Sequence, residues 1–472
     1  MVSISKRKFN NIELENTSIK IVSHSCALIS LGEIKILCDP WLFGDVFNNG
    51  WSLKLKSKNL GLLTREDINS ITHLWISHEH PDHFHFPSLK YLTNNFENIS
   101  KVTVLMKKDK RTTDKIGPVF KKFGFKKIKF LRHLEKYKIT DQLSISIFHH
   151  RHIDSALLIF LDNKPFILNL NDAELNKNDC TLIKKRYGSF KILINQFSIA
   201  GFDGILDKNI LEENKKSLLK KMANQHKYLG ANVTIPFASF MWFSRDDNKH
   251  LNKWHNSLLD VYDFFQKEKI NCFCMEPPSE FISGEKIINK SNKPHHELVN
   301  IPPEFHDTYI PIGKNELADL IKKRINELKT FSNSILFNFV EKEFFILVKD
   351  KNWILKLTTS KNKISCICLD LKLTKDAPKM LVNLQPLYFA FSNSFGIQTL
   401  GVSGRYLFEG YNEIPKIWRL IRILSSLDNN QTPLRLSTLL RVSVYQTIFD
   451  RLDTLPGQIL QQIKRFYKQT YS

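Results

Sequence analysis

The stretch HEHPDH, residues 78–83, places several possible metal-binding side chains close together. His78, His80, Asp82 and His83 follow the pattern His-x-His-x-Asp-His. Neutral imidazoles and a carboxylate are ligand types that Zn²⁺, Fe and Mn accept. Four such groups within six positions exceed what a single ion with an open coordination position needs. The spacing therefore favours two adjacent metal ions.

Further possible ligands lie downstream, again where apolar runs end. The run SISIF leads into His149 and His150, with His152 two positions later, and the run FILNLN ends just before Asp172. Because each polar cluster terminates an apolar run, all of them can lie on one edge of a sheet. An isolated histidine cluster is usually a solvated loop, but the whole set in this order favours a metal centre.

The elements that must position these side chains alternate between strands and helices. THLWIS, directly before the first cluster, has the character of a buried strand, and Pro81 interrupts any helical continuation. The expected strands are 18–24, 26–32, 33–41, 72–77, 101–106, 143–150, 190–198 and 231–239, with a hairpin over 156–172 that turns at Asp162-Asn163, and the expected helices are 65–71, 85–96, 116–124 and 209–230. This succession predicts an α/β layer structure.

The second half of the chain has a different pattern. The polar, Pro-punctuated segment 288–311 indicates a linker or domain-edge loop. A helix is expected over 314–329, followed by alternating runs over 335–359 and 363–374 that are typical of antiparallel strands. The sequence thus predicts a metal-binding domain at 1–300, an α+β domain of unknown role at 301–430 and a basic helical tail at 431–472.

Composition narrows the partners and the location. Of 472 residues, 69 are Lys or Arg and 47 are Asp or Glu, which gives a net charge of +22. The basic segment 107–138 contains no recognised nucleic-acid motif, which favours a solvated face or an anion-attracting rim. No apolar run approaches the roughly 20 residues that span a bilayer, and the N-terminus has no apolar signal core, so we expect a cytoplasmic location. The seven cysteines form no CxxC pair and are interpreted as buried small residues.

The ligand set resembles that of the metallo-β-lactamase superfamily. Three further segments, DPWLFGDVFNNGWSL from Asp39, LINQFSIAGF from Leu193 and IPFASFMWFS from Ile235, resemble the metallo-β-lactamase-like half of the CMP-N-acetylneuraminate hydroxylases and their bacterial relatives. The resemblance covers about 19–244. It implies an αβ/βα sandwich with metal ions at one sheet edge.

The resemblance also implies the role of each ligand. One ion would be held by His78, His80 and His150, with His149 and His152 as competing assignments for the third ligand. The other ion would be held by Asp82 and His83, and Asp172 would bridge the two. These are two divalent ions, with zinc favoured over iron, and a water bound to them would have a pKa near ~7 and become a hydroxide nucleophile. Asp82 would also act in catalysis by orienting that water.

Two departures from the family pattern bear on function. The hydroxylases carry a Rieske centre, which requires C-x-H and C-x-x-H pairs, and no cysteine of this sequence has that context. We therefore expect no Rieske module. The superfamily's hydrolases usually have a further metal-binding histidine after the fifth strand, where this sequence reads IPFASFMWFS. His226, His250 and His255 flank that place and are interpreted as surface histidines.

Several other residues near the motifs carry separate interpretations. His24 is either structural or an indirect support of a ligand, and Asp39 with its neighbours Pro40 and Trp41 is expected to shape the floor of the site. Glu79 is expected to point to solvent, His85 to pack or support a ligand, and Arg405 to lie on the surface, with contact to an anionic substrate as the alternative.

Three functions follow from these observations. The leading hypothesis is a metal-dependent hydrolase acting on an anionic small molecule, phosphorylated or nucleotide-linked. The first alternative is an oxygen-activating diiron oxygenase that draws electrons from a separate donor. The second alternative is a non-catalytic binding protein, which the complete ligand set disfavours.

Overall fold

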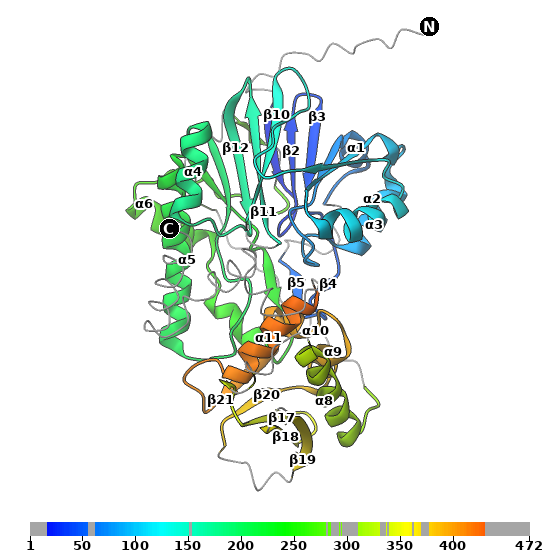
Figure 1. Cartoon of the computed structure of the whole chain (residues 1–472). Helices are drawn as coiled ribbons and strands as arrows, with labels where there is room; N and C mark the ends of the chain where they lie inside the picture. Colours follow the sequence, from blue (N-terminus) through cyan, green and yellow to red (C-terminus); the bar gives the residue numbers. More distant parts are fainter. Residues whose placement is uncertain are drawn as a thin grey trace, which may run out of the picture.

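The computed structural model describes residues 17–54, 62–150, 153–279, 310–330, 339–360, 363–369 and 377–429, with short pieces at 282–284, 292, 294 and 337. In this part of the chain, two large sheets face each other in the N-terminal region and helices lie against their outer sides (Figure 1). A smaller α+β region lies beyond one end of the sheets (Figure 1). Among the described residues, no helix combines the length and the apolar character needed to cross a membrane.

The first sheet combines antiparallel and parallel strands. Its members are β1 (Thr17–Ile21), β2 (Ala27–Leu31), β3 (Ile34–Cys38), β6 (His73–Trp75), β7 (Thr103–Lys107), β8 (Lys127–Leu131) and β16 (Ile282–Ser283). Their order is β16-β1-β2-β3-β6-β7-β8, with β3, β6, β7 and β8 parallel. Parallel neighbours need crossover connections. These are formed by α1 (Arg65–Ser70), α2 (Phe86–Asn95), the short 3₁₀ turn Ile99–Lys101, the π-helical turn Thr112–Ile116 and α3 (Gly117–Lys122).

The second sheet has the same mixed character. Its members are β9 (Tyr137–Lys138), β10 (Leu143–His149), β11 (Ser155–Leu161), β12 (Lys164–Asn171), β13 (Ile192–Gln196) and β14 (Val233–Phe237). Their order is β14-β13-β12-β11-β10-β9, and β12, β13 and β14 are parallel. The helices of this half are α4 (Lys177–Tyr187), α5 (Lys208–Leu229) and α6 (Leu258–Lys267).

The main core lies between the two sheets. Ile29 and Ile36 from the first sheet pack in the same buried cluster as Ile145 and Ile194 from the second. Because successive strand side chains point to opposite faces, the same strands also supply outer clusters that the helices cover. The predicted αβ/βα sandwich, an α/β fold with helices outside two sheets, is confirmed.

Two chain reversals show why the sequence folds this way locally. Asp162 and Asn163 turn the β11–β12 hairpin with φ angles of +48° and +63°, which is the conformation that tight hairpins require and that Asp and Asn tolerate. Gly230 ends α5 in the left-handed conformation with φ +67°, where a glycine has no steric penalty. Both predicted reversals are confirmed.

The C-terminal region is an α+β unit with its own core. Its sheet has the order β19-β18-β17-β20-β21. The elements are β17 (Glu343–Val348), β18 (Trp353–Ser360), β19 (Lys363–Leu369), β20 (Lys379–Val382), β21 (Tyr406–Glu409), α8 (Lys314–Thr330), α9 (Leu384–Ser392), α10 (Gly396–Ser403) and α11 (Lys416–Asn429). The expected helix at 314–329 and the antiparallel strands after it are confirmed, whereas α9 and α10 were not predicted. Most of the expected linker at 288–311 and all of the expected tail at 431–472 lie outside the described residues, so the domain boundaries stay a prediction.

A small sheet and several polar contacts join the two regions. The sheet consists of β15 (Met241–Phe243), β5 (Trp51–Leu53) and β4 (Asp45–Val46), followed by the 3₁₀ turn Lys249–Trp254. Beside it, the Asn248 amide donates to the carbonyls of Gly50 and Ser403 at 2.9 and 2.7 Å. A Cβ on Gly50 would lie 2.5 Å from the Ser403 Cβ, so only glycine permits this approach.

Arg405 is part of this junction and was wrongly predicted to lie on the surface or to meet a substrate. Its side chain is 1% exposed and its Nε lies 3.0 Å from Asp247 Oδ1. Its Nη1 donates to Gln385 at 2.9 Å. The guanidinium thus links elements of both regions by charge-assisted hydrogen bonds.

Candidate metal centre

The ligand residues lie at one edge of the two facing sheets. The parallel strands β3 and β6 end there, and the pairing of Ala27 with Cys38 puts the β1–β2 loop at the same edge. The second sheet meets this edge through the start of β11, where Ser155 donates to the Ser77 carbonyl at 2.6 Å. Strand ends of both sheets therefore converge on one point.

The first group of possible ligands contains His78, His83 and Asp172. One donor atom of each lies within 4.8 Å of the others. His83 Nε2 lies 3.1 Å from Asp172 Oδ2, and His78 Nε2 lies 2.8 Å from His80 Nδ1. The structure thus brings His78, His83 and Asp172 within reach of a common ion, and His80 lies beside His78 without belonging to either group among the described residues.

The second group contains His24, Asp82 and His83. Asp82 Oδ2 lies 3.1 Å from His83 Nε2 and 3.5 Å from His24 Nε2. All three side chains are buried, and their donor atoms also fall within 4.8 Å of one another. Because His83 belongs to both groups, the two possible ion positions are adjacent.

The buried carboxylate of Asp39 supports this arrangement from the Nδ1 side of His83. Asp39, at the end of β3, accepts hydrogen bonds from the Ser77 backbone at 2.7 Å and the Ser77 hydroxyl at 2.6 Å. It also lies 3.0 Å from His83 Nδ1 and contacts the Asn171 amide. A carboxylate on the far nitrogen fixes the tautomer and orientation of a metal-binding imidazole and leaves Nε2 for the ion. Asp39 therefore supports a ligand directly, which is more than the predicted role of shaping the floor.

The titratable side chains of the cluster shift one another's pKa values. Burial lowers the pKa of His83, but the carboxylates of Asp82 and Asp172 outweigh it and hold that pKa well above its usual value. Burial raises the pKa of Asp82, yet His83 and His24 outweigh it and keep that pKa well below its usual value. Burial, reinforced by His83 and His80, lowers the pKa of His78. His78 is thus neutral, which is the form that binds a metal ion.

His150, predicted to complete the first ion's ligands, belongs to neither of the two groups among the described residues. It is buried at the end of β10, and its Nδ1 lies 3.6 Å from Asp179 Oδ2. Asp154 Oδ1 lies 4.0 Å from His78 Nε2. Of the competing assignments, His149 Nε2 contacts the Leu131 carbonyl at 3.0 Å, and His152 lies outside the described residues. His150 as a ligand stays a prediction.

These side chains fit a pair of divalent ions. Asp82 Oδ1 and Asp172 Oδ1 are buried oxygens without a hydrogen-bond partner among the described residues. Such groups are costly unless a cation or another donor satisfies them. Imidazole nitrogens and carboxylate oxygens around them match the ligand types of zinc and of non-haem iron.

The C-terminal region reaches the centre through α10. The side-chain amide of Gln398 lies 3.0 Å from His80 Nε2, the nitrogen opposite the one that faces His78. Gln398 and His80 are 318 positions apart in the chain, and no motif marked this glutamine. The charge pattern of the sequence did not indicate this contact either, because the glutamine side chain is neutral.

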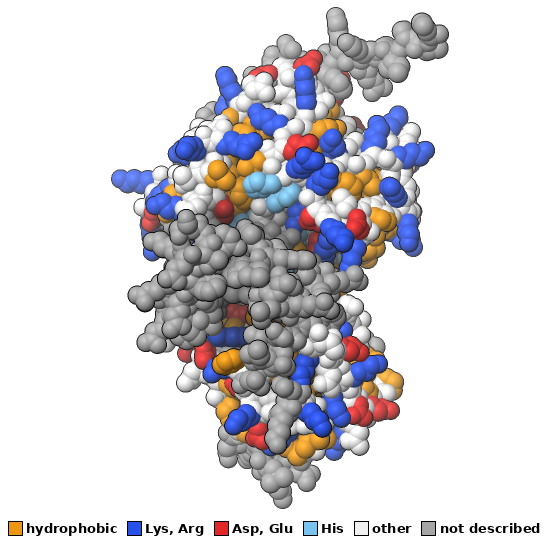
Figure 2. Space-filling model, viewed as in Figure 1, with side chains coloured by type: hydrophobic (Ala, Val, Ile, Leu, Met, Phe, Trp, Pro, Cys, Tyr) orange, Lys and Arg blue, Asp and Glu red, His pale blue; other side chains and the backbone are white. Residues whose placement is uncertain are grey.

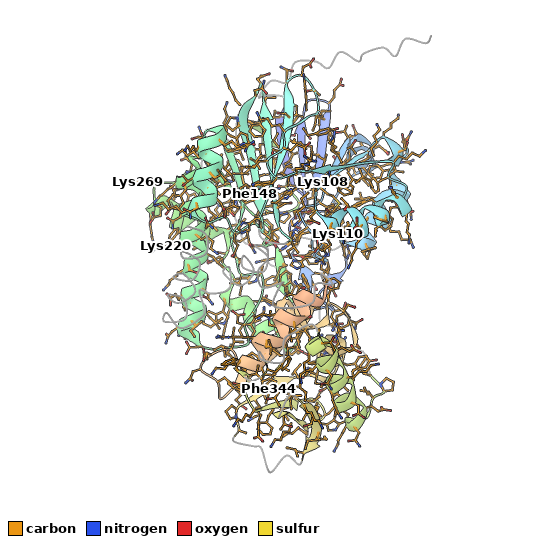
Figure 3. The ribbon with its side chains drawn as sticks, viewed as in Figure 1. Lys108, Lys110, Phe148, Lys220, Lys269 and Phe344 are labelled. Carbon is orange, nitrogen blue, oxygen red and sulfur yellow. The ribbon has the colours of Figure 1, made fainter. Side chains whose placement is uncertain are left out.

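Basic residues follow β7 at the same sheet edge. Arg111 Nη1 lies 2.8 Å from Glu79 Oε1 and its guanidinium lies 5.3 Å from the Phe395 ring centre. Lys108 and Lys110, labelled in Figure 3, are exposed beside it. Figure 2 shows histidine side chains on the face of the N-terminal region with Lys and Arg side chains around them. The segment 107–138 thus includes a basic side chain next to Glu79 of the 78–83 loop, and the choice between a solvated face and an anion-attracting rim stays a prediction.

Other interpretations have mixed outcomes. Glu79 does not point to solvent, because it pairs with Arg111. His85 caps α2, where its ring nitrogen lies 2.8 Å from the Ser88 hydroxyl, so the predicted packing role is confirmed. His226, His250 and His255 are half-buried, so they lie only partly at the surface, and they belong to neither ligand group among the described residues.

Comparison with known proteins assigns a class to the metal-binding half. Residues 18–175 match the family model described as a β-lactamase superfamily domain. With the two-sheet architecture, this makes the N-terminal region a metallo-β-lactamase-fold domain. The match includes all six predicted ligands.

Particular relatives can then be named. The cytidine monophosphate-N-acetylneuraminic acid hydroxylase of Xenopus laevis is 25% identical over 338 residues, which cover 66% of this chain and 54% of the relative. The chain spans about half the length of the curated relatives that align with most of it. Among solved structures, CmlA, a diiron β-hydroxylase from Streptomyces venezuelae, matches at 14% identity, TM-score 0.39, 57% of this chain and 54% of its own. The isothiocyanate hydrolase from Delia radicum gut bacteria matches at 12% identity, TM-score 0.38, 56% of this chain and 97% of its own.

Proposed function

We propose that this chain is a metal-dependent hydrolase that uses two adjacent divalent ions, zinc rather than iron, on an anionic small molecule. One observation carries the proposal, namely two ligand groups that share His83 at the edge of the sandwich. The two groups contain five side chains, more than one four-coordinate ion with an open position would take, and His83 Nε2 can bind only one of the two ions. The match of residues 18–175 to a β-lactamase superfamily domain also supports the proposal.

Each residue has a separate task in this proposal. His78, His80 and His150 hold one ion, Asp82 and His83 hold the other, and Asp172 lies between them. The bound ions would polarise the bond under attack and bring the pKa of a shared water toward about 7. Asp82 Oδ1, which has no hydrogen-bond partner among the described residues, orients the attacking water. Asp39 keeps His83 in the orientation that presents Nε2.

The anionic substrate class rests on the charges beside the centre. Lys108 and Lys110 are exposed at the end of β7, and Arg111 lies next to Glu79 of the ligand loop. A basic surface of this kind raises the local concentration of anions and speeds their arrival. A phosphorylated or nucleotide-linked small molecule suits these charges.

Metal content and hydrolysis of a simple probe test the proposal. The full chain, purified without chelators, should contain two zinc ions and cleave bis(p-nitrophenyl) phosphate. Removal of the metal should abolish the cleavage and added zinc should restore it. Asp141→Ala, which removes a carboxylate whose side chain is 98% exposed, serves as the control and should behave as wild type. A chain that binds no divalent ion at micromolar concentrations would overturn the proposal.

A second candidate is an oxygen-activating diiron enzyme that draws electrons from a separate donor protein. The alignment with hydroxylases over 66% of this chain favours it. Asp154, 4.0 Å from His78 Nε2, adds a carboxylate of the kind that iron accepts. Two irons with an oxo-bridge absorption band in the purified protein would select this function, and two zincs would select hydrolysis.

A further inference from the structure

The second ligand group contains a histidine that the sequence pattern did not assign to a metal ion. His24 lies in the loop between β1 and β2, more than 50 positions before the motif at 78–83. Its side chain is 1% exposed, although a histidine on a surface loop would normally be solvated. The burial of His24 therefore needs a physical explanation.

The loop is fixed to the metal-binding segments on both sides of His24. The Ser25 hydroxyl donates to the Asp82 carbonyl at 2.8 Å, and the Ser23 hydroxyl donates to the Trp41 carbonyl at 2.5 Å. The His24 ring packs edge-on against Trp41 at 5.5 Å between ring centres. These contacts hold the ring in place with Nε2 toward Asp82, while Nδ1 has no hydrogen-bond partner among the described residues.

The donor atoms have the spacing of ligands on one ion. Ligands about 2.1 Å from a tetrahedral ion lie about 3.4 Å from one another. His24 Nε2 and Asp82 Oδ2 are 3.5 Å apart, and Asp82 Oδ2 and His83 Nε2 are 3.1 Å apart. An ion can therefore replace these direct contacts without a large movement of the side chains.

Among the described residues, the segment after β14 supplies no alternative for this position. The segment after β14, where related hydrolases place a further histidine, reads ASFMWF, and its nearest histidines, His250 and His255, belong to neither ligand group among the described residues. Asp82 and His83, with Asp172 shared between the two ions, would leave the second ion one ligand short of a full set of four. His24 makes up this deficit.

We infer that His24 Nε2 is a protein ligand of the second divalent ion, together with Asp82 and His83. The inference rests on the proposed two-metal function. Related hydrolases place a metal-binding histidine near the end of the domain. In this chain the corresponding ligand would come from the first loop of the first sheet. The last strand of the sandwich is then free of metal binding, while the β1–β2 loop becomes part of the centre.

Metal stoichiometry tests the inference without any assay of activity. Cobalt(II) is titrated into metal-free full-length protein, and the absorption bands together with chelator competition give the number and affinity of bound ions. Wild type should bind two ions. His24→Gln, which keeps a side-chain amide that can donate to Asp82, should bind one ion with unchanged affinity and the other more than about 100-fold more weakly, since even the loss of an indirect support costs about 10–100-fold.

Two controls separate the possible causes of such a loss. His85→Gln alters a buried histidine that caps α2 outside both ligand groups and should keep both ions. Near-ultraviolet circular dichroism of metal-free His24→Gln should match wild type, which excludes unfolding as the cause. Two ions held by His24→Gln with wild-type affinity would overturn the role of His24 and leave the proposed function intact. Wild type that binds fewer than two ions would overturn both.

Discussion

The N-terminal sandwich and the C-terminal α+β region contribute to the metal centre in different ways. The sandwich supplies the ligands of both groups, and a buried carboxylate, Asp39, orients them from behind. The C-terminal region supplies one neutral side chain, Gln398, which touches a ligand on its outward nitrogen. We therefore expect the sandwich to determine whether ions bind, and Gln398 to adjust one of the proposed ligands.

The largest effect is expected inside the sandwich. Asp172→Ala removes the carboxylate that lies 3.1 Å from His83 Nε2, and we expect loss of bound metal because the proposed bridge between the ions disappears. Inductively coupled plasma mass spectrometry of the purified protein measures this loss. Asp141→Ala is the matched control at an exposed site and should retain two ions. Full metal occupancy in Asp172→Ala would contradict the assignment of this aspartate.

The next effect concerns the junction between the regions. Arg405→Met leaves Asp247 buried without its charged partner, which typically costs about 3–5 kcal/mol. Urea unfolding should show this cost in the transition of the C-terminal region. Lys249→Met, beside it, removes a pair with 58% and 77% exposed side chains and should cost less than about 1 kcal/mol. Equal effects of the two substitutions would show that Arg405 does not hold the regions together.

A smaller effect on metal affinity is expected from Asp39, which contacts the proposed ligand His83. Asp39→Asn removes the negative charge beside His83 Nδ1 and should weaken metal binding by about 10–100-fold. Competition with a chelator of known affinity measures the change. Asp45→Asn, which alters a carboxylate bonded to Ser52 away from the ligands, should leave the affinity unchanged. If the combination of Asp39→Asn with His83→Ala binds no more weakly than His83→Ala alone, Asp39 acts through His83.

The smallest effect is expected from the C-terminal side. Gln398→Ala removes the contact to His80 Nε2 and should lower the affinity for one ion by about tenfold or less. Gln398→Glu replaces the amide nitrogen that lies 3.0 Å from His80 Nε2 with a carboxylate oxygen, which can accept an Nε2 proton, and should preserve the affinity. An alanine variant with unchanged affinity and unchanged cobalt spectrum would confine the C-terminal region to a role outside the centre.

The same contrast explains what could be predicted from the sequence. The motif at 78–83 needs no tertiary information, because its four ligands follow one strand within six positions, and the alternation of apolar runs indicated the sandwich. Asp172 was found because it ends an apolar run that pairs with its neighbour along the chain. These features are local, so composition and periodicity carry them.

The missed residues depend on contacts between distant segments. Asp39 follows a strand like many turn residues, and only folding shows that Ser77, His83 and Asn171 surround it. Gln398 lies on a short helix, α10, whose sequence GIQTLGVS has no marked polar face. Arg405 was wrongly placed because burial of an arginine depends on a partner, here Asp247, that lies 158 positions away. Sequence patterns do not record such pairings.

His80 and Gln398 are in contact but far apart in the chain, so the ribosome makes His80 well before Gln398. Translation of the 318 residues between them takes roughly 15–60 s at about 5–20 residues per second. Once β14 has emerged, the nascent sandwich can expose its histidine edge to the surrounding solution until α10 follows. Metal loading can therefore precede the arrival of α10, and the ion that is captured in those seconds depends on which metals are then available to the emerging chain.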